Sequence, residues 1–180
     1  PRLVEENQQE LQLVEQLGAD LEFARSWPEI DEVQQVLQQR GHWQGKPQKR
    51  IAGSGASAPL RVVTEGDYVI WVGRNSRQNE QVTFSKGSPQ DVWFHAHDVP
   101  GAHVVLKFDG RPLPDGVKEQ AAALAAFYSA KRTDGRVIVD YTRCLNVRKI
   151  KGAAQGMVTY KSEGTYTVMP RSEKDINTKD

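Results

Sequence analysis

The segment DVWFHAHDVPGAHVVL, residues Asp91–Leu106, decides how the second half of this chain can fold. It begins with the large apolar pair Trp93–Phe94, and its end, Val104–Leu106, is typical of a strand that is covered on both faces. Pro100–Gly101 lies between these parts and favours a turn. The pattern therefore predicts a strand, a Pro-Gly turn and a second strand that returns beside the first.

The same segment holds three of the four histidines, and its predicted geometry brings His95 and His103 together beside an indole. Imidazole titrates near neutral pH and ligates zinc, so one interpretation is a small metal-dependent hydrolase that uses His95, His103 and Asp98. A zinc site needs further ligands, and the single cysteine, Cys144, lies far along the chain. The other interpretation is that the imidazoles hydrogen-bond backbone groups at a tight turn. We favour this structural interpretation, expect no catalytic group, metal or cofactor, and keep the hydrolase as the alternative.

The composition indicates one domain with an appendage, because 180 residues of which 38% are hydrophobic can bury an ordinary core. No apolar run approaches the ~20 residues of a membrane span, so we expect no membrane contact. A single cysteine excludes an internal disulfide framework and is typical of the cytoplasm. The chain begins with Pro1 inside an expected helix, which favours a piece of a longer protein.

The formal net charge of +1 conceals an asymmetry along the chain. Residues 1–40 carry three basic and nine acidic side chains, a net charge of −6, whereas residues 41–180 carry a net charge of +7. An acidic arm therefore precedes a basic domain. Basic domains attract polyanions, and RNA or DNA is the commonest such partner, although a basic surface can also serve solubility alone.

Residues 1–41 predict a helical, coiled-coil arm. In residues 1–26 an apolar stripe recurs at heptad-like spacing at Val4, Leu11, Val14 and Leu21, and it is widened by Leu3, Leu13 and Leu17. A second helix is expected to begin at the capping pair Ser26 and Glu29 and to end at Gly41, with an apolar face formed by Ile30, Val33 and Leu37.

Three further segments follow the arm. Residues 42–59 are basic and then rich in glycine and serine, which predicts a linker, and residues 172–180 predict a disordered polar tail. Residues 60–171 predict a compact α+β domain with a mixed, largely antiparallel sheet and one alanine-rich helix at 118–131. Its expected strands include hairpins at 61–64 with 68–72 and at 157–160 with 165–169, together with a single strand at 136–142.

Two polar segments of this domain are candidate RNA contacts. Residues 73–79 predict a tight polar loop whose side chains suit phosphates and base edges, namely Arg74, Asn75, Arg77, Gln78 and Asn79. Further along, a run without acidic residues carries the cations Arg143, Arg148, Lys149 and Lys151. The alternatives are a turn with left-handed asparagines for the first segment and a solvated surface strand for the second.

Several motifs occur in a fixed order, and together they resemble the NFACT-R domain of the RqcH/NEMF family. The order is Val72-Gly73-Arg74-Asn75, Gln78-Asn79-Glu80, Asp91-x-Trp93-Phe94-His95, Pro100-Gly101-Ala102-His103-Val104-Val105, Val139-Asp140-Tyr141-Thr142, Val147-Arg148-Lys149, Gly156-x-Val158-x-Tyr160 and Val168-x-Pro170. The resemblance covers about residues 61–170, and residues 1–41 resemble the end of the family's middle coiled coil.

The resemblance implies a non-enzymatic, RNA-binding role in ribosome-associated quality control. Family members bind the large ribosomal subunit that carries a stalled peptidyl-tRNA and help to recruit tRNA for alanine tailing. The expected partners are therefore large-subunit rRNA, tRNA and the remainder of the full-length protein. The resemblance also leaves His95 and His103 as RNA contacts in addition to their structural role. The family's N-terminal domain is absent from this sequence, so this segment alone is not expected to support tailing.

Overall fold

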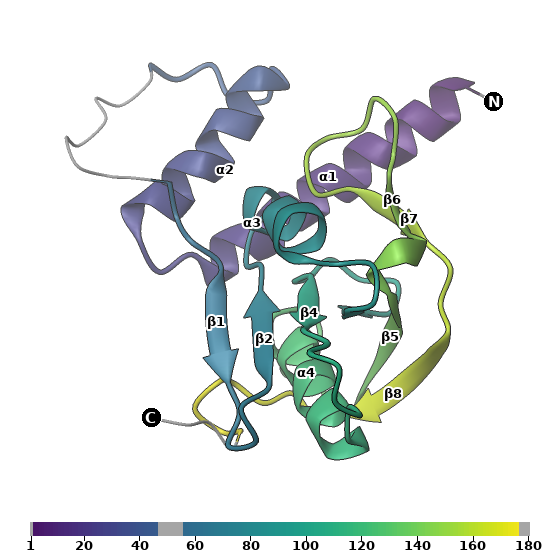
Figure 1. The fold of residues 1–180 in the computed structure, drawn as a ribbon. Helices are drawn as coiled ribbons and strands as arrows, with labels where there is room; N and C mark the ends of the chain where they lie inside the picture. The colour runs from purple at the N-terminus through teal and green to yellow at the C-terminus, as the bar shows by residue number, and fades with distance from the viewer. Residues whose placement is uncertain (1, 47–55, 177–180) are drawn as a thin grey trace.

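A computed structural model describes residues 2–46 and 56–176 as a helical arm followed by a sheet domain (Figure 1). The helices are α1 (Arg2–Phe23), α2 (Trp27–Gln39), α3 (Ser76–Gln81), the π-helix η1 (Val82–Lys86), α4 (Asp115–Phe127) and the 3-10 helix η2 (Cys144–Asn146). The strands are β1 (Leu60–Val63), β2 (Val69–Val72), β3 (Val92–Ala96), β4 (Val104–Leu106), β5 (Val137–Arg143), β6 (Val147–Lys149), β7 (Val158–Tyr160) and β8 (Gly164–Val168).

The main sheet has six strands in the order β1-β2-β4-β3-β5-β8, and every neighbouring pair is antiparallel. The Pro-Gly turn joins β3 to β4 as the sequence predicts, and Trp93 lies opposite Val105. Strands β6 and β7 form a separate antiparallel ribbon. The predicted α+β fold with an antiparallel sheet is therefore confirmed.

The two faces of the sheet bury different clusters, because successive side chains of a strand point to opposite faces. Phe94 belongs to the large core on the face covered by α4, which lies behind the sheet in the view of Figure 1. Trp93 belongs to a smaller cluster with Val82 of η1, Val105 and Val147 of β6. The arrangement places the histidine-bearing segment between this smaller cluster and the arm.

The alanine-rich helix begins and ends earlier than the sequence predicts. It starts at Asp115 after Pro114, and Tyr128 is its C-terminal cap. Residues 121–126, five alanines and Leu124, are completely buried, so this part of the helix is covered on all sides, and the sheet covers one of them. Alanine combines the highest helix propensity with the smallest volume, so α4 can approach the sheet closely.

The arm packs through two of the residues that widen the predicted stripe, and not through its heptad positions. The heptad-like residues of α1 are 43–59% exposed, and they are Val4, Leu11, Val14 and Leu21. The buried stripe includes Leu13, Leu17 and Asp20, and its two leucines pack on Val33 of α2 and Met157. The side of α1 that packs on the rest of the protein is therefore the side that carries the buried carboxylate of Asp20.

The predicted terminal hairpin is wrong, although both of its strands exist. Strand β7 pairs with β6, and β8 pairs with β5 at the edge of the main sheet. Glu163 donates its backbone N–H to the Tyr141 carbonyl, which directs the chain away from β7. Alternating apolar residues show that a strand exists but do not show which strand it joins.

The linker and tail predictions fall partly outside the described residues, which exclude 47–55 and 177–180. Ser57, inside the predicted linker, donates its hydroxyl to Glu32 at 2.7 Å. Residues 172–176 are ordered against the domain, since Ile176 is only 4% exposed and Glu173 accepts a 2.6 Å hydrogen bond from the Tyr128 hydroxyl. The disordered tail stays a prediction, and against it the polar composition of residues 172–176 conceals one apolar anchor.

Candidate nucleic-acid interface

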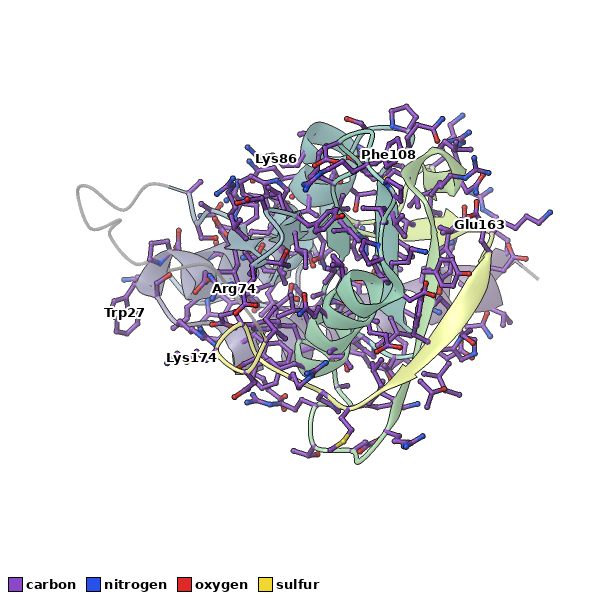
Figure 2. The ribbon with its side chains drawn as sticks, turned by 60° about the horizontal axis from the view of Figure 1, so that its bottom comes forward. Trp27, Arg74, Lys86, Phe108, Glu163 and Lys174 are labelled. Carbon is purple, nitrogen blue, oxygen red and sulfur yellow. The ribbon has the colours of Figure 1, made fainter. Side chains whose placement is uncertain are left out.

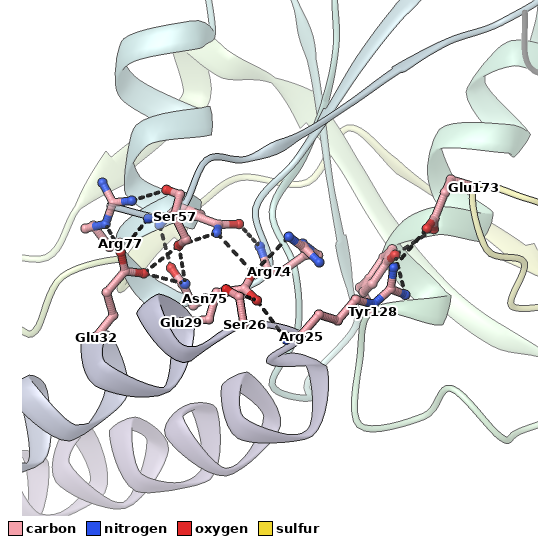
Figure 3. A network of polar contacts seen from close by, with 11 residues as sticks. Arg25, Ser26, Glu29, Glu32, Ser57, Arg74, Asn75, Arg77, Tyr128 and Glu173 are labelled. Atoms are coloured by element: carbon pink, nitrogen blue, oxygen red, sulfur yellow. Dashed lines mark hydrogen bonds and ion pairs between the residues drawn. The ribbon is translucent and has the colours of Figure 1, made fainter. Parts of the chain in front are cut away.

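Residues 76–79 begin α3, so only residues 73–75 of the predicted polar loop lie outside a helix (Figure 3). Asn75 caps the helix, and its side chain accepts a hydrogen bond of 2.8 Å from the backbone N–H of Gln78. The side chains of Asn75, Gln78 and Asn79 are buried, with 3% of their residue surface exposed or less. These three side chains therefore do not form an exposed surface.

The two guanidinium groups of this segment pair with carboxylates of the arm (Figure 3). The Arg74 Nη2 atom lies 2.8 Å from Glu29 Oε1, and the Arg77 Nε atom lies 2.9 Å from Glu32 Oε1. Arg77 also donates to the Ser57 carbonyl. The acidic side chains of α2 thus neutralise the cations that the sequence assigns to RNA.

Asn79 connects α3 to the histidine turn. Its Oδ1 atom accepts a 2.9 Å hydrogen bond from the His103 backbone N–H, and its Nδ2 atom donates to the Gly101 carbonyl at 3.2 Å. A Cβ atom at Gly73 would lie 2.6 Å from Asn79 Oδ1, so this close approach requires glycine. The segment from Gly73 to Asn79 thus connects the arm to the sheet domain. Direct RNA contact by its side chains stays a prediction.

The second predicted segment, residues 143–151, presents its cations outward. The Arg143 Nε atom lies 3.0 Å from Glu163, and the Lys149 Nζ atom lies 2.7 Å from Glu80. Arg148 and Lys151 are exposed, and within residues 2–46 and 56–176 neither forms an ion pair with a carboxylate. These two cations are therefore available to a polyanion without loss of an internal ion pair.

Aromatic rings lie beside the cations on this side of the domain. The Lys86 Nζ atom lies 4.7 Å from the centre of the Trp71 ring, and Lys149 Nζ lies 5.0 Å from that of Phe84. Arg61 is the cross-strand neighbour of Trp71. Interleaved cations and exposed rings suit a backbone with unstacked bases. We call this surface the aromatic–cationic face, and it comprises Arg61, Trp71, Phe84, Lys86, Phe108 and Lys149, together with the exposed Arg148, which precedes Lys149 in β6.

Five residues of this face were not predicted as RNA contacts from the sequence, namely Arg61, Trp71, Phe84, Lys86 and Phe108. Two of them, Phe84 and Phe108, are exposed rings. The two rings are 36% and 43% exposed. The Lys107 ammonium donates to the Lys86 carbonyl at 2.7 Å, which brings the two chain segments together, and Figure 2 shows Lys86 and Phe108 along one edge of the molecule. Residues 84–86 and 107–108 each contain a lysine and a phenylalanine. The two segments lie about 20 residues apart, so the sequence does not show that they form one surface.

The turn brings His95 and His103 together as predicted, with ring centres 5.4 Å apart. His103 Nδ1 lies 2.9 Å from Thr83 Oγ1, and the same hydroxyl accepts a 3.2 Å hydrogen bond from the Trp93 indole. Burial lowers the pKa of His95 to about 4 and lowers the pKa of His103 well below its usual value. Both rings are therefore neutral at physiological pH.

The geometry does not assemble the ligand set of the hydrolase alternative. Asp98 is directed to His97, whose Nε2 atom lies 3.0 Å from its carboxylate, and the Asp98 side chain is 85% exposed. Across the part of the chain that the structure describes, no three histidine, cysteine or carboxylate side chains are grouped as a metal would require. The alternative would have to rest on His95 and His103 alone.

Residues 59–162 match the family described as the NFACT protein RNA binding domain. The chain belongs to this family. The sequence-based assignment is thereby confirmed, and the match includes all strands from β1 to β7. None of the helices within residues 2–46 and 56–176 combines the length and apolar character needed to cross a membrane.

Curated relatives of this NFACT domain share both the arm and the sheet domain. The Rqc2 homolog RqcH of Streptococcus suis is 35% identical over 173 residues, which are 96% of this chain and 31% of that protein. The Rqc2 homolog RqcH of Bacillus subtilis is 34% identical over 177 residues, or 96% of this chain and 30% of that protein. The chain thus spans about a third of the length of these relatives.

A solved structure has the same fold over nearly the whole chain. It is the C-terminal part of the fibronectin/fibrinogen-binding protein from Streptococcus suis, with a TM-score of 0.85 and 33% sequence identity. The similarity covers 97% of this chain and 70% of that one. The arrangement of arm and domain is therefore shared with that relative.

Proposed function

We propose that this chain is the non-catalytic RNA-binding module of a cytoplasmic ribosome-associated quality control factor. The observation that carries the proposal is the aromatic–cationic face on a domain of the NFACT RNA-binding family. The relatives named Rqc2 homolog RqcH support the quality-control role. The charge of +7 on residues 41–180 supports a polyanionic partner.

Within that role, the module binds large-subunit rRNA and tRNA while the remainder of the full-length protein supplies the other contacts. In such a complex, a stalled peptidyl-tRNA marks the subunit and alanine tailing is the outcome. The support for these finer statements is the family relationship alone, because the chain spans about a third of its curated relatives.

Binding is proposed to begin with the phosphate backbone. Arg148, Lys86 and Lys151 provide exposed cations, and release of counterions makes this term favourable and dependent on salt. Trp71 and Phe84 then offer ring faces to unstacked bases, a contact worth about 1–3 kcal/mol per base. The buried segment from Arg74 to Asn79 supports this surface from behind by fixing α3.

The replacement of Arg148 and Lys149 by alanine tests the proposal. We expect affinity for structured RNA to fall for all sequences, and the slope of log K against log salt to flatten by roughly one unit per lost phosphate contact. The matched control replaces Arg136, which is exposed, and Lys118, which pairs with Asp115 on α4 behind the sheet. Binding isotherms at several salt concentrations provide the measurement.

Two results would contradict the proposal. An unchanged affinity and salt slope in the double variant would remove Arg148 and Lys149 from the interface. An equal loss in the control variant would show that binding follows net charge and not the aromatic–cationic face.

A further inference from the structure

A pocket of about 530 Å³ lies between α1, the β3–β4 turn and the β6–β7 ribbon. This volume falls within the range of roughly 300–1,000 Å³ that small-molecule sites occupy. The pocket is distinct from the aromatic–cationic face, since its lining shares no residue with that set. None of the lysines or arginines among the described residues lines it, so the pocket is not built for a phosphate.

The inner wall of the pocket is a cluster of four flat rings. Trp93 stacks on His95 with ring centres 5.6 Å apart and an interplanar angle of 10°. Tyr160 lies 4.6 Å from Trp93, and His103 lies edge-on at 5.0 Å. Trp93 is 0% exposed and His103 is 4% exposed, so these two rings support the wall from inside. His95 and Tyr160 are only partly buried, and they are the rings on which a planar heterocycle can stack.

The polar atoms of this wall are neutral and are positioned by buried partners. His103 Nδ1 is occupied by Thr83 Oγ1, so its other ring nitrogen is the one left for a ligand. The Tyr160 hydroxyl donates to Asp140 at 2.7 Å, so the hydroxyl is already occupied, and the residue lines the pocket. His95 carries no charge near neutral pH because burial lowers its pKa to about 4.

The rim of the pocket carries carboxylates and amides. Glu15 and Gln12 approach from α1, and Asp98 approaches from the β3–β4 turn. Carboxylate oxygens accept hydrogen bonds from amino groups and repel phosphates. Ile150 also lines the rim, and its neighbours Lys149 and Lys151 are exposed on either side of it in the chain.

We infer that this pocket binds one unstacked nucleobase that carries an amino group, as adenine, cytosine and guanine do. The base stacks on His95 and Tyr160, its amino group donates to a rim carboxylate, and its phosphate stays outside near the flanking lysines. The inference rests on the proposed RNA-binding function and adds a base-reading site to a surface that otherwise recognises the backbone.

Nucleotide titrations followed by NMR test the inference directly. The probes are AMP, CMP, GMP and UMP, and the signals are the ring resonances of the four histidines. We expect the His95 and His103 signals to shift with the three amino-bearing nucleotides and to respond about tenfold more weakly to UMP. His42, which pairs with Glu10 on the arm, provides the internal control signal.

Variants provide the second arm of the test. His95→Leu is expected to weaken AMP binding about tenfold, and Glu15→Gln, an exposed change on α1, to reduce the preference over UMP about fivefold. His42→Leu is the matched control. Ribose 5-phosphate, which has no base, is expected to leave the His95 and His103 signals in place.

The inference is overturned if no nucleotide moves these two signals, or if ribose 5-phosphate or UMP moves them as strongly as AMP. That failure is separate from a failure of the proposed function. The response of RNA affinity to the Arg148 and Lys149 double variant does not depend on whether a mononucleotide enters the pocket.

Discussion

Asp20 and Glu29 are buried carboxylates that hold the helical arm on the sheet domain. Asp20 is 2% exposed and accepts hydrogen bonds of 2.9 Å from both the backbone N–H and the hydroxyl of Ser76. Glu29 accepts from the Arg25 backbone N–H at 2.7 Å and pairs with Arg74. Burial raises the pKa of Asp20 to about 6, so its charge is retained at neutral pH at a cost in solvation.

Replacement of Asp20 by alanine is expected to lower the free energy of unfolding by about 1–3 kcal/mol. The reason is that the buried Ser76 N–H and hydroxyl lose their acceptor. Urea denaturation of the variant measures the change, and Glu22→Ala, an exposed change on the same helix, is the control. Equal stability of the two variants would show that Asp20 does not hold the arm.

His97 predicts a pH dependence of stability with a definite sign. Its hydrogen bond with Asp140, 2.8 Å long, raises the pKa of the imidazole above the usual 6.5. A raised pKa contributes stability that is complete below the unfolded pKa and is lost as pH rises through the folded pKa. We expect the difference in unfolding free energy between the protein and His97→Gln to shrink as pH rises from about 6 to about 8. A difference that is constant over this range, or that grows, would contradict the assignment.

Residue identity alone does not show which polar side chains face solvent. The sequence shows that residues 73–79 are rich in hydrogen-bond donors, but not that the protein itself uses them. Their carboxylate partners, Glu29 and Glu32, lie more than 40 residues earlier in the chain. Only the docking of α2 on α3 makes these pairs, and this docking leaves no local pattern.

At the scale of the elements, α3 and the histidine turn depend on a close approach at Gly73. A Cβ atom there would lie 2.6 Å from Asn79 Oδ1 and 2.7 Å from its backbone nitrogen. Gly73→Ala is therefore expected to lower the free energy of unfolding by about 1–3 kcal/mol, because the backbone of α3 must shift. Gly135→Ala, where a Cβ meets nothing within 4 Å, is the matched control for thermal melts. A Gly73 variant as stable as the Gly135 variant would show that the backbone around Gly73 and Asn79 can move apart at little cost in stability.

The sequence predicts an element correctly where a local pattern determines it. The prediction is wrong where a segment distant in the chain determines which partner the element pairs with. The strands around Trp93 and Val104 and the hairpin of β1 and β2 follow from apolar runs bounded by turn residues. The partners of β7 and β8 do not follow from such runs. Alternating apolar residues determine which face of a strand is buried, but not which neighbouring strand it pairs with. The prediction for the arm is partly wrong for a related reason. The apolar stripe of α1 is wide, and the contact with the rest of the protein buries Leu13 and Leu17 but leaves the heptad positions exposed.

In the whole molecule, the negative charge of the arm and the positive charge of the sheet domain partly compensate each other. Carboxylates of α2 neutralise Arg74 and Arg77, so the net positive charge of the domain is concentrated on cations such as Lys86 and Arg148. The sequence gives the totals, and the motif order indicates the family. The location of the exposed cations follows only from the fold.

The RNA interface can be located by crosslinking the chain to large ribosomal subunits and to tRNA and identifying the linked residues by mass spectrometry. We expect crosslinks on the aromatic–cationic face, at Phe84, Lys86, Phe108, Arg148 and Lys149. Crosslinks confined to α4 behind the sheet, or none above the level of a neutral polymer control, would contradict this expectation.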